Sequence, residues 1–405
     1  MTTKSSLFKN RSFLSVWSGN AASELGGAFG TFCNSILVFQ LTGSGLALGS
    51  MWILYYVPSL LLQFVIGPFI DRWSRKRIMI FSQLVRGTVF LVPLFLLYIN
   101  ELEVWHVYAV QLVIGLITPL YVPANQAITP TLVKEGELHQ ANAYLDGTAR
   151  LMSFLAPVLA GVVIEFTSVQ VTLYFVSGLL LSSGLLLLLV EERKQVGAIR
   201  ASWWSEMKVG YRMFFQNPVL LWLGVFLGFV QFGVGVTLIT TLPYITTELN
   251  GSYADYGYFM AGFPVGYILG AVLVPKIKMK GLGLMIGSLF IGGLTFIALY
   301  FIDWLPLAIL TEVVGGVAMA VFSIQNLTLF QKSISNSMLG KVASVRLLLI
   351  RTFMLAGIVV GGLLSELWGI RPLYLLIGIV ICIVSVCGTV LPYFKFLRNF
   401  KAVDV

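Results

Sequence analysis

The sequence predicts an all-helical integral membrane protein with twelve transmembrane helices in two related six-helix bundles. Three observations predict this: the composition, the number of long apolar segments and an internal repeat. Of the 405 residues, 58% are hydrophobic and only 11% are charged, whereas soluble domains carry about a quarter charged residues. A water-soluble fold of this length would lack the charges to cover its surface, so the apolar excess must face lipid.

A helix that crosses a bilayer needs about 20 mainly apolar residues, and twelve segments of the sequence meet this condition. They cover residues 13–40, 46–70, 78–99, 104–127, 143–166, 169–190, 219–247, 256–275, 281–302, 304–330, 343–367 and 371–392. These runs are too long and too continuously apolar for alternating membrane strands. Asn20 and Glu24 interrupt the first run, which we therefore expect to be a spanning helix rather than a cleaved signal peptide.

The basic residues predict which ends of the segments face the cytoplasm. Most of the 26 Lys and Arg residues lie near the termini and in the loops that follow even-numbered segments, while the opposite loops hold Arg371 beside several acids. Because cytoplasmic loops carry the excess of Lys and Arg, both termini are predicted to be cytoplasmic. The scattered bases also argue against nucleic acid as a partner, since a nucleic-acid binder gathers its bases on one polar surface.

An internal repeat predicts where the two bundles divide. Arg150 and Glu165 recur as Arg351 and Glu366, each 201 residues later, and Leu-Thr-Gly-Ser at 41–44 recurs as Leu-Asn-Gly-Ser at 249–252. Parallel repeats of this kind build transporters that bind a solute between the repeats. We therefore predict an N-terminal bundle in residues 1–190, a partly amphipathic cytoplasmic linker in 191–218 and a C-terminal bundle in 219–405.

A charged motif follows the second apolar segment. Gly67, Asp71, Arg72, Arg75 and Lys76 resemble the signature G-x-x-x-D-R-x-x-R-[KR]-[KR] of the major facilitator superfamily, with Ser74 where Gly is common. An acid at this position can accept hydrogen bonds from the N-terminus of a neighbouring helix, whose dipole favours negative charge. The resemblance implies a cytoplasmic gate; the alternative is that the bases only set the orientation. Residues 270–276, the matching place in the second half, lack the Asp-Arg pair.

Two further stretches extend the resemblance to the whole chain. Residues 123–143 look like the link between helices four and five of bacterial macrolide-efflux-like and siderophore-exporter-like permeases. Ala156, Pro157, Ala160 and Gly161 resemble the antiporter signature G-P-x-x-G-G, with Ala in place of two glycines. The resemblance implies the major-facilitator fold, antiport by alternating access and a bacterial inner membrane, but it does not specify the substrate.

Ionisable residues inside spanning helices are costly and are functional candidates by default. Glu24 lies near the middle of the first segment, in a polar stripe with Asn20, Ser23 and Gly27. A carboxyl group buried in an apolar cavity can bind and release a proton; the alternative is a fixed hydrogen-bond partner for another helix. Glu312, in the outer half of the tenth segment, is the second candidate. Uncharged polar or amphipathic residues in the apolar segments are further candidates for the cavity: Asn34, Tyr55, Gln63, Gln111, Asn125, Gln231, Tyr267, Gln325 and Asn326.

Five further charged residues lie in the cytoplasmic half of the spanning segments. These are Arg86, Asp146, Arg150, Arg346 and Arg351. Asp146 and Arg150 are four residues apart and share one helix face. The simple interpretation is a local ion pair, and the more specific one is a gating contact that breaks between transport states.

The leading functional hypothesis is a proton-coupled exporter of an amphiphilic small molecule, such as a drug, a macrolide-like compound or a secreted metabolite. The alternatives are a nutrient importer or uniporter, and a non-transporting receptor or lipid scramblase on the same fold. The sequence has no P-loop, no nucleophile elbow and no cluster of metal ligands, which argues against an enzyme and an ATP-driven pump. We expect a monomer without cofactor or metal, whose partners are the bilayer, a small molecule and protons.

Overall fold

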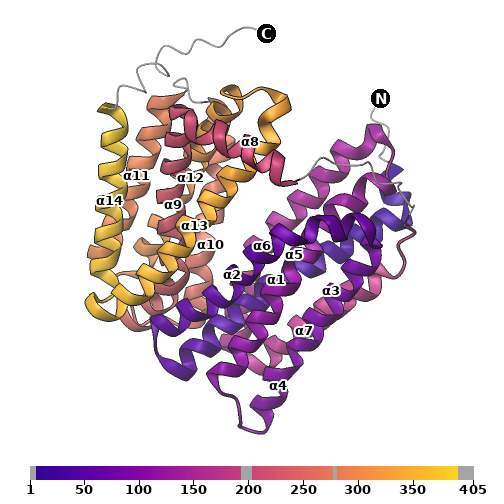
Figure 1. The fold of residues 1–405 in the computed structure, drawn as a ribbon. Coiled ribbons are helices and arrows are strands. Elements are labelled where there is room, and N and C mark those ends of the chain that lie inside the picture. Colours follow the sequence, from indigo (N-terminus) through magenta and orange to yellow (C-terminus); the bar gives the residue numbers. More distant parts are fainter. Residues whose placement is uncertain (1–5, 193–202, 277–280, 391–405) are drawn as a thin grey trace. The chain divides into compact units, whose positions relative to one another are not determined.

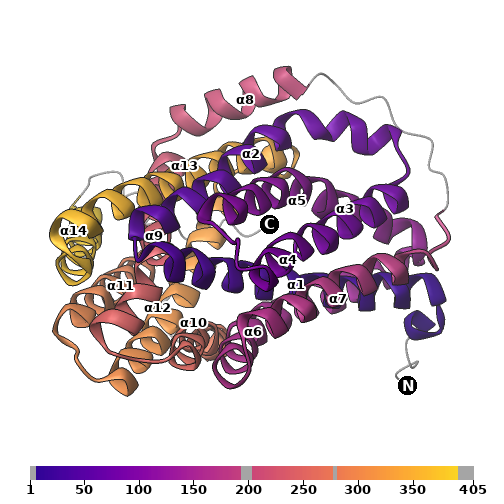
Figure 2. The same ribbon diagram turned by 90° about the horizontal axis from the view of Figure 1, so that it is seen from below.

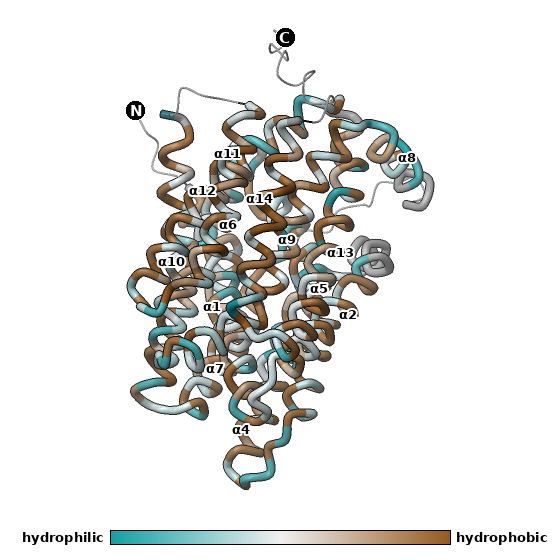
Figure 3. Tube along the Cα trace, turned by 90° about the vertical axis from the view of Figure 1, so that its left-hand side faces the viewer, coloured by the Kyte–Doolittle hydropathy of each residue, from teal (hydrophilic) through white to brown (hydrophobic). Residues whose placement is uncertain are grey.

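The computed structural model of the protein describes residues 6–192, 203–276 and 281–390, and every regular element within them is helical. Within these residues, 12 helices are long and apolar enough to cross a membrane. They correspond one to one to the twelve predicted segments, so the predicted fold class is confirmed. Hydrophobic residues run along most of these helices, as Figure 3 shows.

The chain divides into two compact units, Met1–Ala198 and Ile199–Val405. The first unit holds α1 (Arg11–Thr42), α2 (Gly45–Arg72), α3 (Arg75–Val89), α4 (Leu91–Tyr98), α5 (Val104–Leu132), α6 (Leu138–Phe166) and α7 (Val169–Leu187). The second holds α8 (Trp203–Gln216), α9 (Pro218–Pro243), α10 (Tyr253–Leu273), α11 (Leu282–Phe301), α12 (Leu305–Lys332), α13 (Asn336–Trp368) and α14 (Ile370–Val390) (Figure 1). The boundary falls in the predicted linker, and α8, which lies in that linker, packs against α13 and α9 of the second unit.

The third predicted segment is one continuous run in the sequence but is broken in the structure. α3 ends at Val89 and α4 begins at Leu91. Pro93 explains the break, because it has no N–H to donate to the carbonyl of Val89 and its ring crowds that carbonyl. The two pieces together still form a single span, Arg75–Tyr98.

The two units repeat the same helix pairs. In the first unit α1 packs against α6, α2 against α5 and α3 against α7; in the second, α9 packs against α13, α10 against α12 and α11 against α14 (Figure 2). Two glycines 201 residues apart allow close approaches at equivalent places in the two units. Gly115 of α5 receives the backbone of Tyr55, and Gly316 of α12 receives the backbone of Phe263. Small residues at helix crossings let the backbones come close where lipid provides no hydrophobic driving force.

Gly115→Ala and Gly316→Ala are each expected to destabilise the protein, because the added methyl group meets a backbone carbonyl rather than a movable side chain. Overpacking of this kind costs about 1–3 kcal/mol, which the unfolding temperature in detergent measures. The matched controls are Gly178→Ala in α7 and Gly292→Ala in α11, where nothing lies within 4 Å of an added Cβ. Equal losses in the controls would show that close helix packing is not the cause.

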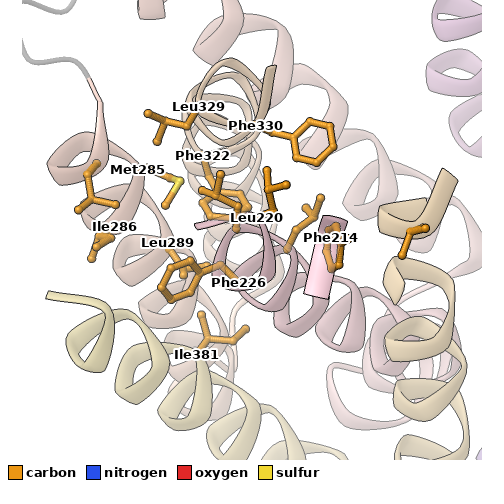
Figure 4. Close-up of a cluster of buried hydrophobic side chains, with 14 of the residues drawn as sticks. Phe214, Leu220, Phe226, Met285, Ile286, Leu289, Phe322, Leu329, Phe330 and Ile381 are labelled. Carbon is orange, nitrogen blue, oxygen red and sulfur yellow. The ribbon is translucent and has the colours of Figure 1, made fainter. Parts of the chain in front are cut away.

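A cluster of large apolar side chains fills the second unit near α8 (Figure 4). Phe214 of α8, Phe226 of α9, Met285 of α11 and Phe322 of α12 are all fully buried in it. Gly224 of α9 makes room for the ring of Phe214. The buried ring therefore fixes α8 to this unit.

Candidate functional site

Arg86 of α3 brings a positive charge into the interior of the first unit. Its side chain is 8% exposed, and its Nη1 donates hydrogen bonds to Ser23 Oγ and Gln83 Oε1, both at 3.2 Å. A Cβ on Gly27 would overlap Nη2 of the guanidinium. Ser23 and Gly27, about one turn apart on α1, thus form the surface that receives this charge.

Glu24 follows Ser23 on α1 and is partly exposed. Its carboxylate interacts electrostatically with Arg86, although no ion pair within 4.0 Å joins the two among the described residues. A charge pair in a low-dielectric interior interacts strongly even when it is not in direct contact. Arg86 is therefore the counter-charge of the predicted coupling residue.

Tyr121 of α5 lies beside both charges. Its side chain is 2% exposed, and its hydroxyl lies near Ser23 and Gln83 and interacts electrostatically with Arg86 and Glu24. That hydroxyl and Nε of Arg86 are buried and have no well-formed hydrogen bond in the described part of the chain. The Tyr121 hydroxyl and Nε of Arg86 are thus available to form hydrogen bonds when the helices around them rearrange.

The polar cluster continues away from Glu24 in two directions. Gln83 Nε2 donates to Ser183 Oγ of α7 at 3.0 Å, and Ser183 Oγ donates to the Gly19 carbonyl of α1 at 2.6 Å. One turn from Glu24, Asn125 Nδ2 of α5 donates to Asn20 Oδ1 at 2.9 Å. α1, α3, α5 and α7 therefore meet around one polar site in the membrane-spanning part of the first unit.

The second unit contains a buried arginine in a different setting. Arg346 of α13 is 9% exposed; its Nη2 donates to Asn326 Oδ1 at 2.7 Å, and its guanidinium lies 4.4 Å from the centroid of the Phe330 ring. Asn326 Nδ2 in turn donates to the Leu223 carbonyl of α9 at 3.0 Å. Asn125 and Asn326 are 201 residues apart, and each bonds the first membrane-spanning helix of its own unit. The repeat thus preserves the asparagine, whereas the two buried arginines lie on non-equivalent helices, α3 and α13.

Glu312 lies two turns inside α12 and is partly exposed. Its Cβ packs against Gly262 of α10, and its carboxylate interacts electrostatically with Tyr244 and Tyr374. It has no hydrogen bond or ion pair with any other described residue. Unlike Glu24, which interacts with Arg86, this carboxylate interacts with no basic side chain in the described part of the chain.

The second half of the predicted gate motif forms the start of α3. Ser74 is the N-cap, and its Oγ accepts from the N–H of Arg77. The carboxylate of Glu192 accepts from the N–H of Arg75 at 2.8 Å and from Ser74 Oγ. The positive end of the helix dipole favours an acid here. Ser74, within the motif, and Glu192, which follows α7, therefore cap this helix together.

The long basic side chains of the motif tie α3 to two other helices. Arg75 Nη1 donates to the Ala127 carbonyl of α5 at 3.0 Å, and Lys76 Nζ donates to the Leu188 carbonyl after α7 at 2.8 Å. The backbone of α2 includes Gly67, Asp71 and Arg72, but their side chains lie outside the described residues.

Glu192→Gln is expected to lower the free energy of unfolding by about 1–2 kcal/mol, because it removes the negative charge from the start of α3 and keeps the shape. The unfolding temperature in detergent measures this. Glu191→Gln is the matched control, since Glu191 is exposed and contacts Ser12 only through its backbone N–H. The assignment is wrong if both variants unfold at the same temperature.

Comparison with known proteins identifies the family. The family model described as Major Facilitator Superfamily matches residues 16–241. The chain belongs to the major facilitator superfamily. Because this is a family of membrane transporters, the protein is a multi-pass membrane transporter and not an enzyme.

Relatives within the superfamily extend over most of the chain. Macrolide efflux protein A of Streptococcus pyogenes is 25% identical over 93% of this chain and 95% of that protein. The MFS-type transporter YvqJ of Bacillus subtilis is 25% identical over 86% of this chain and 85% of its own. Enterobactin exporter EntS of Shigella boydii is 24% identical over 68% of this chain and 66% of its own.

Solved structures of superfamily transporters share the fold. A bacterial homologue of the human lysosomal transporter Spinster has a TM-score of 0.75 at 13% identity and covers 99% of this chain and 100% of its own. A bacterial homologue of the iron transporter ferroportin has a TM-score of 0.74 at 16% identity, with 95% and 100% covered. These likenesses show the fold alone.

The other predicted site residues of this superfamily member are dispersed. Asp146 and Arg150 form an ion pair of 2.9 Å with side chains 67% and 70% exposed. Asn34 Nδ2 donates to Gln111 Oε1 at 2.8 Å in a buried position. Tyr55 packs against Trp52 and Tyr56. Gln231, Arg351 and Pro157 are partly exposed. Ala156, Ala160 and Gly161 are buried.

Sequence reasoning missed Gln83, Tyr121 and Ser183 in the polar cluster. Gln83 could have been found, because it lies three residues before Arg86 and hence on the same helix face. Tyr121 and Ser183 carry no such signal, because their contacts depend on the packing of α5 and α7. The sequence places Arg371 in the outer loops beside several acids, and the structure shows ion pairs with two of them, Glu248 at 3.0 Å and Asp303 at 2.6 Å.

Proposed function

We propose that the protein exports an amphiphilic small molecule in exchange for protons, with both termini in the cytoplasm. In this account Glu24 binds the transported proton and Arg86 is its counter-charge. The single observation that carries the proposal is an acid in the middle of α1 that interacts electrostatically with a buried arginine in the last turn of α3, surrounded by Ser23, Gln83 and Tyr121.

The cluster supports proton binding for an electrostatic reason. When Glu24 is charged, it and Arg86 are together neutral; when Glu24 is protonated, Arg86 is left as the uncompensated charge. A change of one charge in a low-dielectric environment carries a large energy. A ligand shifts the equilibrium between two conformations only by the difference between its binding free energies for them. A proton bound at Glu24 supplies such a difference.

The direction and substrate class rest on relatives and composition. Two relatives are named as a macrolide efflux protein and an enterobactin exporter, which supports export. The chain has 29 Phe and 12 Met residues, and adaptable, polarisable side chains suit a site that accepts amphiphilic molecules. Asn20 and Asn125 offer polar contacts one turn from Glu24.

The test is compound-induced proton movement in everted membrane vesicles with an acidified lumen. Erythromycin, tetraphenylphosphonium and a catecholate are added in turn, and a pH-sensitive dye reports protons leaving the lumen. We expect at least one compound to release protons with the wild type and none to do so in vesicles without the protein.

The same vesicles distinguish the alternatives. A labelled compound that equilibrates without proton release indicates a uniporter, and a compound that leaves the lumen together with protons indicates an importer. Movement of labelled phospholipid between leaflets, without any solute movement, indicates a scramblase. Binding without any movement indicates a receptor.

A further inference from the structure

The second unit separates its charges between its two ends. From residue 208 to residue 390 the acids are Glu248, Asp255, Asp303, Glu312 and Glu366. They lie at or near the end where α9 finishes and α10 begins, and there Arg371 pairs with two of them. Lys208, Arg212, Lys276, Lys332 and Lys341 lie at the opposite end. We call this opposite end, defined by those five residues, the basic end of the second unit.

The basic end differs from the charged motif of the first unit, where acids accompany the bases. There the carboxylate of Glu192 accepts hydrogen bonds from the start of α3. By contrast, Lys208, Arg212 and Lys332 make no hydrogen bond or ion pair with any described residue. These three bases of the basic end thus have no acidic partner in the part of the chain that the structure describes.

α8 presents these bases on a helix fixed against the unit. Gly210 lies against the backbone of Lys341 in α13, and Phe214, one turn on, is fully buried in the apolar cluster (Figure 4). Lys208 and Arg212 are four residues apart and both exposed. With 3.6 residues per turn, they face roughly opposite to the pair Gly210 and Phe214. The bases thus point away from the protein.

An aromatic stripe lies next to the bases on the same helix. Tyr211 and Phe215 are 58% and 40% exposed, and their ring centroids are 4.4 Å apart. A helix with exposed aromatic residues beside Lys and Arg is the pattern that lies in a membrane interface, with rings in the boundary region and bases toward the headgroups. α8 combines this pattern with a rigid attachment to α13 and α9.

We propose that α8 and the end of α12 form a binding surface for the headgroups of anionic phospholipids, in which Lys208, Arg212 and Lys332 contact the phosphate. The charges are complementary, and the exposed rings match the acyl boundary beneath the headgroup. The side chain of Glu206, the acid nearest to Lys208 in the sequence, lies outside the described residues. The inference does not depend on the transported compound.

The test is native mass spectrometry of the full-length protein in detergent, titrated with dioctanoyl-phosphatidylglycerol or dioctanoyl-phosphatidylcholine. Each basic residue near an anionic headgroup contributes a factor of roughly five in affinity. We therefore expect Lys208→Gln/Arg212→Gln to weaken phosphatidylglycerol binding about thirty-fold, and Lys332→Gln alone about five-fold. Phosphatidylcholine binding should stay unchanged.

The matched control is Lys9→Gln/Arg11→Gln, which removes two exposed bases from the first unit and should leave phosphatidylglycerol affinity at the wild-type value. Inorganic phosphate at the same concentration separates a lipid site from a free-anion site: competition as strong as that of the lipid would overturn the lipid assignment. Equal affinity for the two lipids, or equal losses in the α8 variant and the control, would also overturn it. The unfolding temperature of each variant verifies that it is folded.

Discussion

Glu24→Gln is expected to reduce compound-induced proton release to the level of vesicles that lack the protein. The amide keeps the shape of the side chain but cannot bind and release a proton at this position. Exchange of labelled compound across the membrane should continue, because an exchange cycle needs no net proton movement. The measurements are proton release in everted vesicles and counterflow of the labelled compound in the same vesicles.

The control for this variant is Glu101→Gln. Glu101 is exposed and lies between α4 and α5, so the same chemical change there should leave proton release at the wild-type level. Wild-type proton release by Glu24→Gln would remove Glu24 from the coupling path. Loss of counterflow together with proton release would instead indicate that the substitution blocks the transport cycle as a whole.

A double-mutant cycle on Glu24 and Arg86 is expected to show strong coupling. Glu24→Gln should lower the free energy of unfolding by roughly 2 kcal/mol, less than the 3–5 kcal/mol of a fully buried pair because Glu24 is partly exposed. A guanidinium cannot lose its charge, whereas a carboxyl group can take up a proton. Arg86→Met should therefore cost less, and Glu24→Gln/Arg86→Met should recover stability relative to Glu24→Gln alone.

The unfolding temperature in detergent measures this cycle, and the Asp146 and Arg150 pair provides its reference. That pair is mostly exposed, and exposed helix pairs have coupling energies of about 0.3–0.5 kcal/mol. A coupling energy between Glu24 and Arg86 of more than about 1 kcal/mol supports the pair as a unit. Additive effects would contradict it. The double variant should also lack proton release, because it has no acid to carry the proton.

The positions of the helices could be predicted from the sequence, because each spanning helix must be about 20 apolar residues long whatever its neighbours are. The break between α3 and α4 was missed, because the apolar run continues through Phe90 and only Pro93 marks it. The repeat was predicted from Arg150 and Arg351. The structure adds two equivalent contacts, at Gly115 and Gly316, that only backbone proximity reveals.

The charged residues of the candidate site could be predicted from the sequence, but the residues that they contact could not. Glu24 and Arg86 stand out because charges are rare in spanning helices. Their association depends on the rotation of α1 and α3 about their axes, which hydropathy does not determine. Glu192 shows the same limit: it lies 117 residues after Arg75, and only the fold brings it to the start of α3.

Solute accumulation in proteoliposomes of the purified protein tests most directly whether transport is an exchange for protons. A compound that releases protons in the vesicle assay is added outside liposomes with an acidic, neutral or alkaline lumen. Accumulation above that of protein-free liposomes is expected only when the lumen is acidic, and it should be lost with Glu24→Gln. Uptake that stops at equal concentrations whatever the gradient, or accumulation in an alkaline lumen, would contradict it.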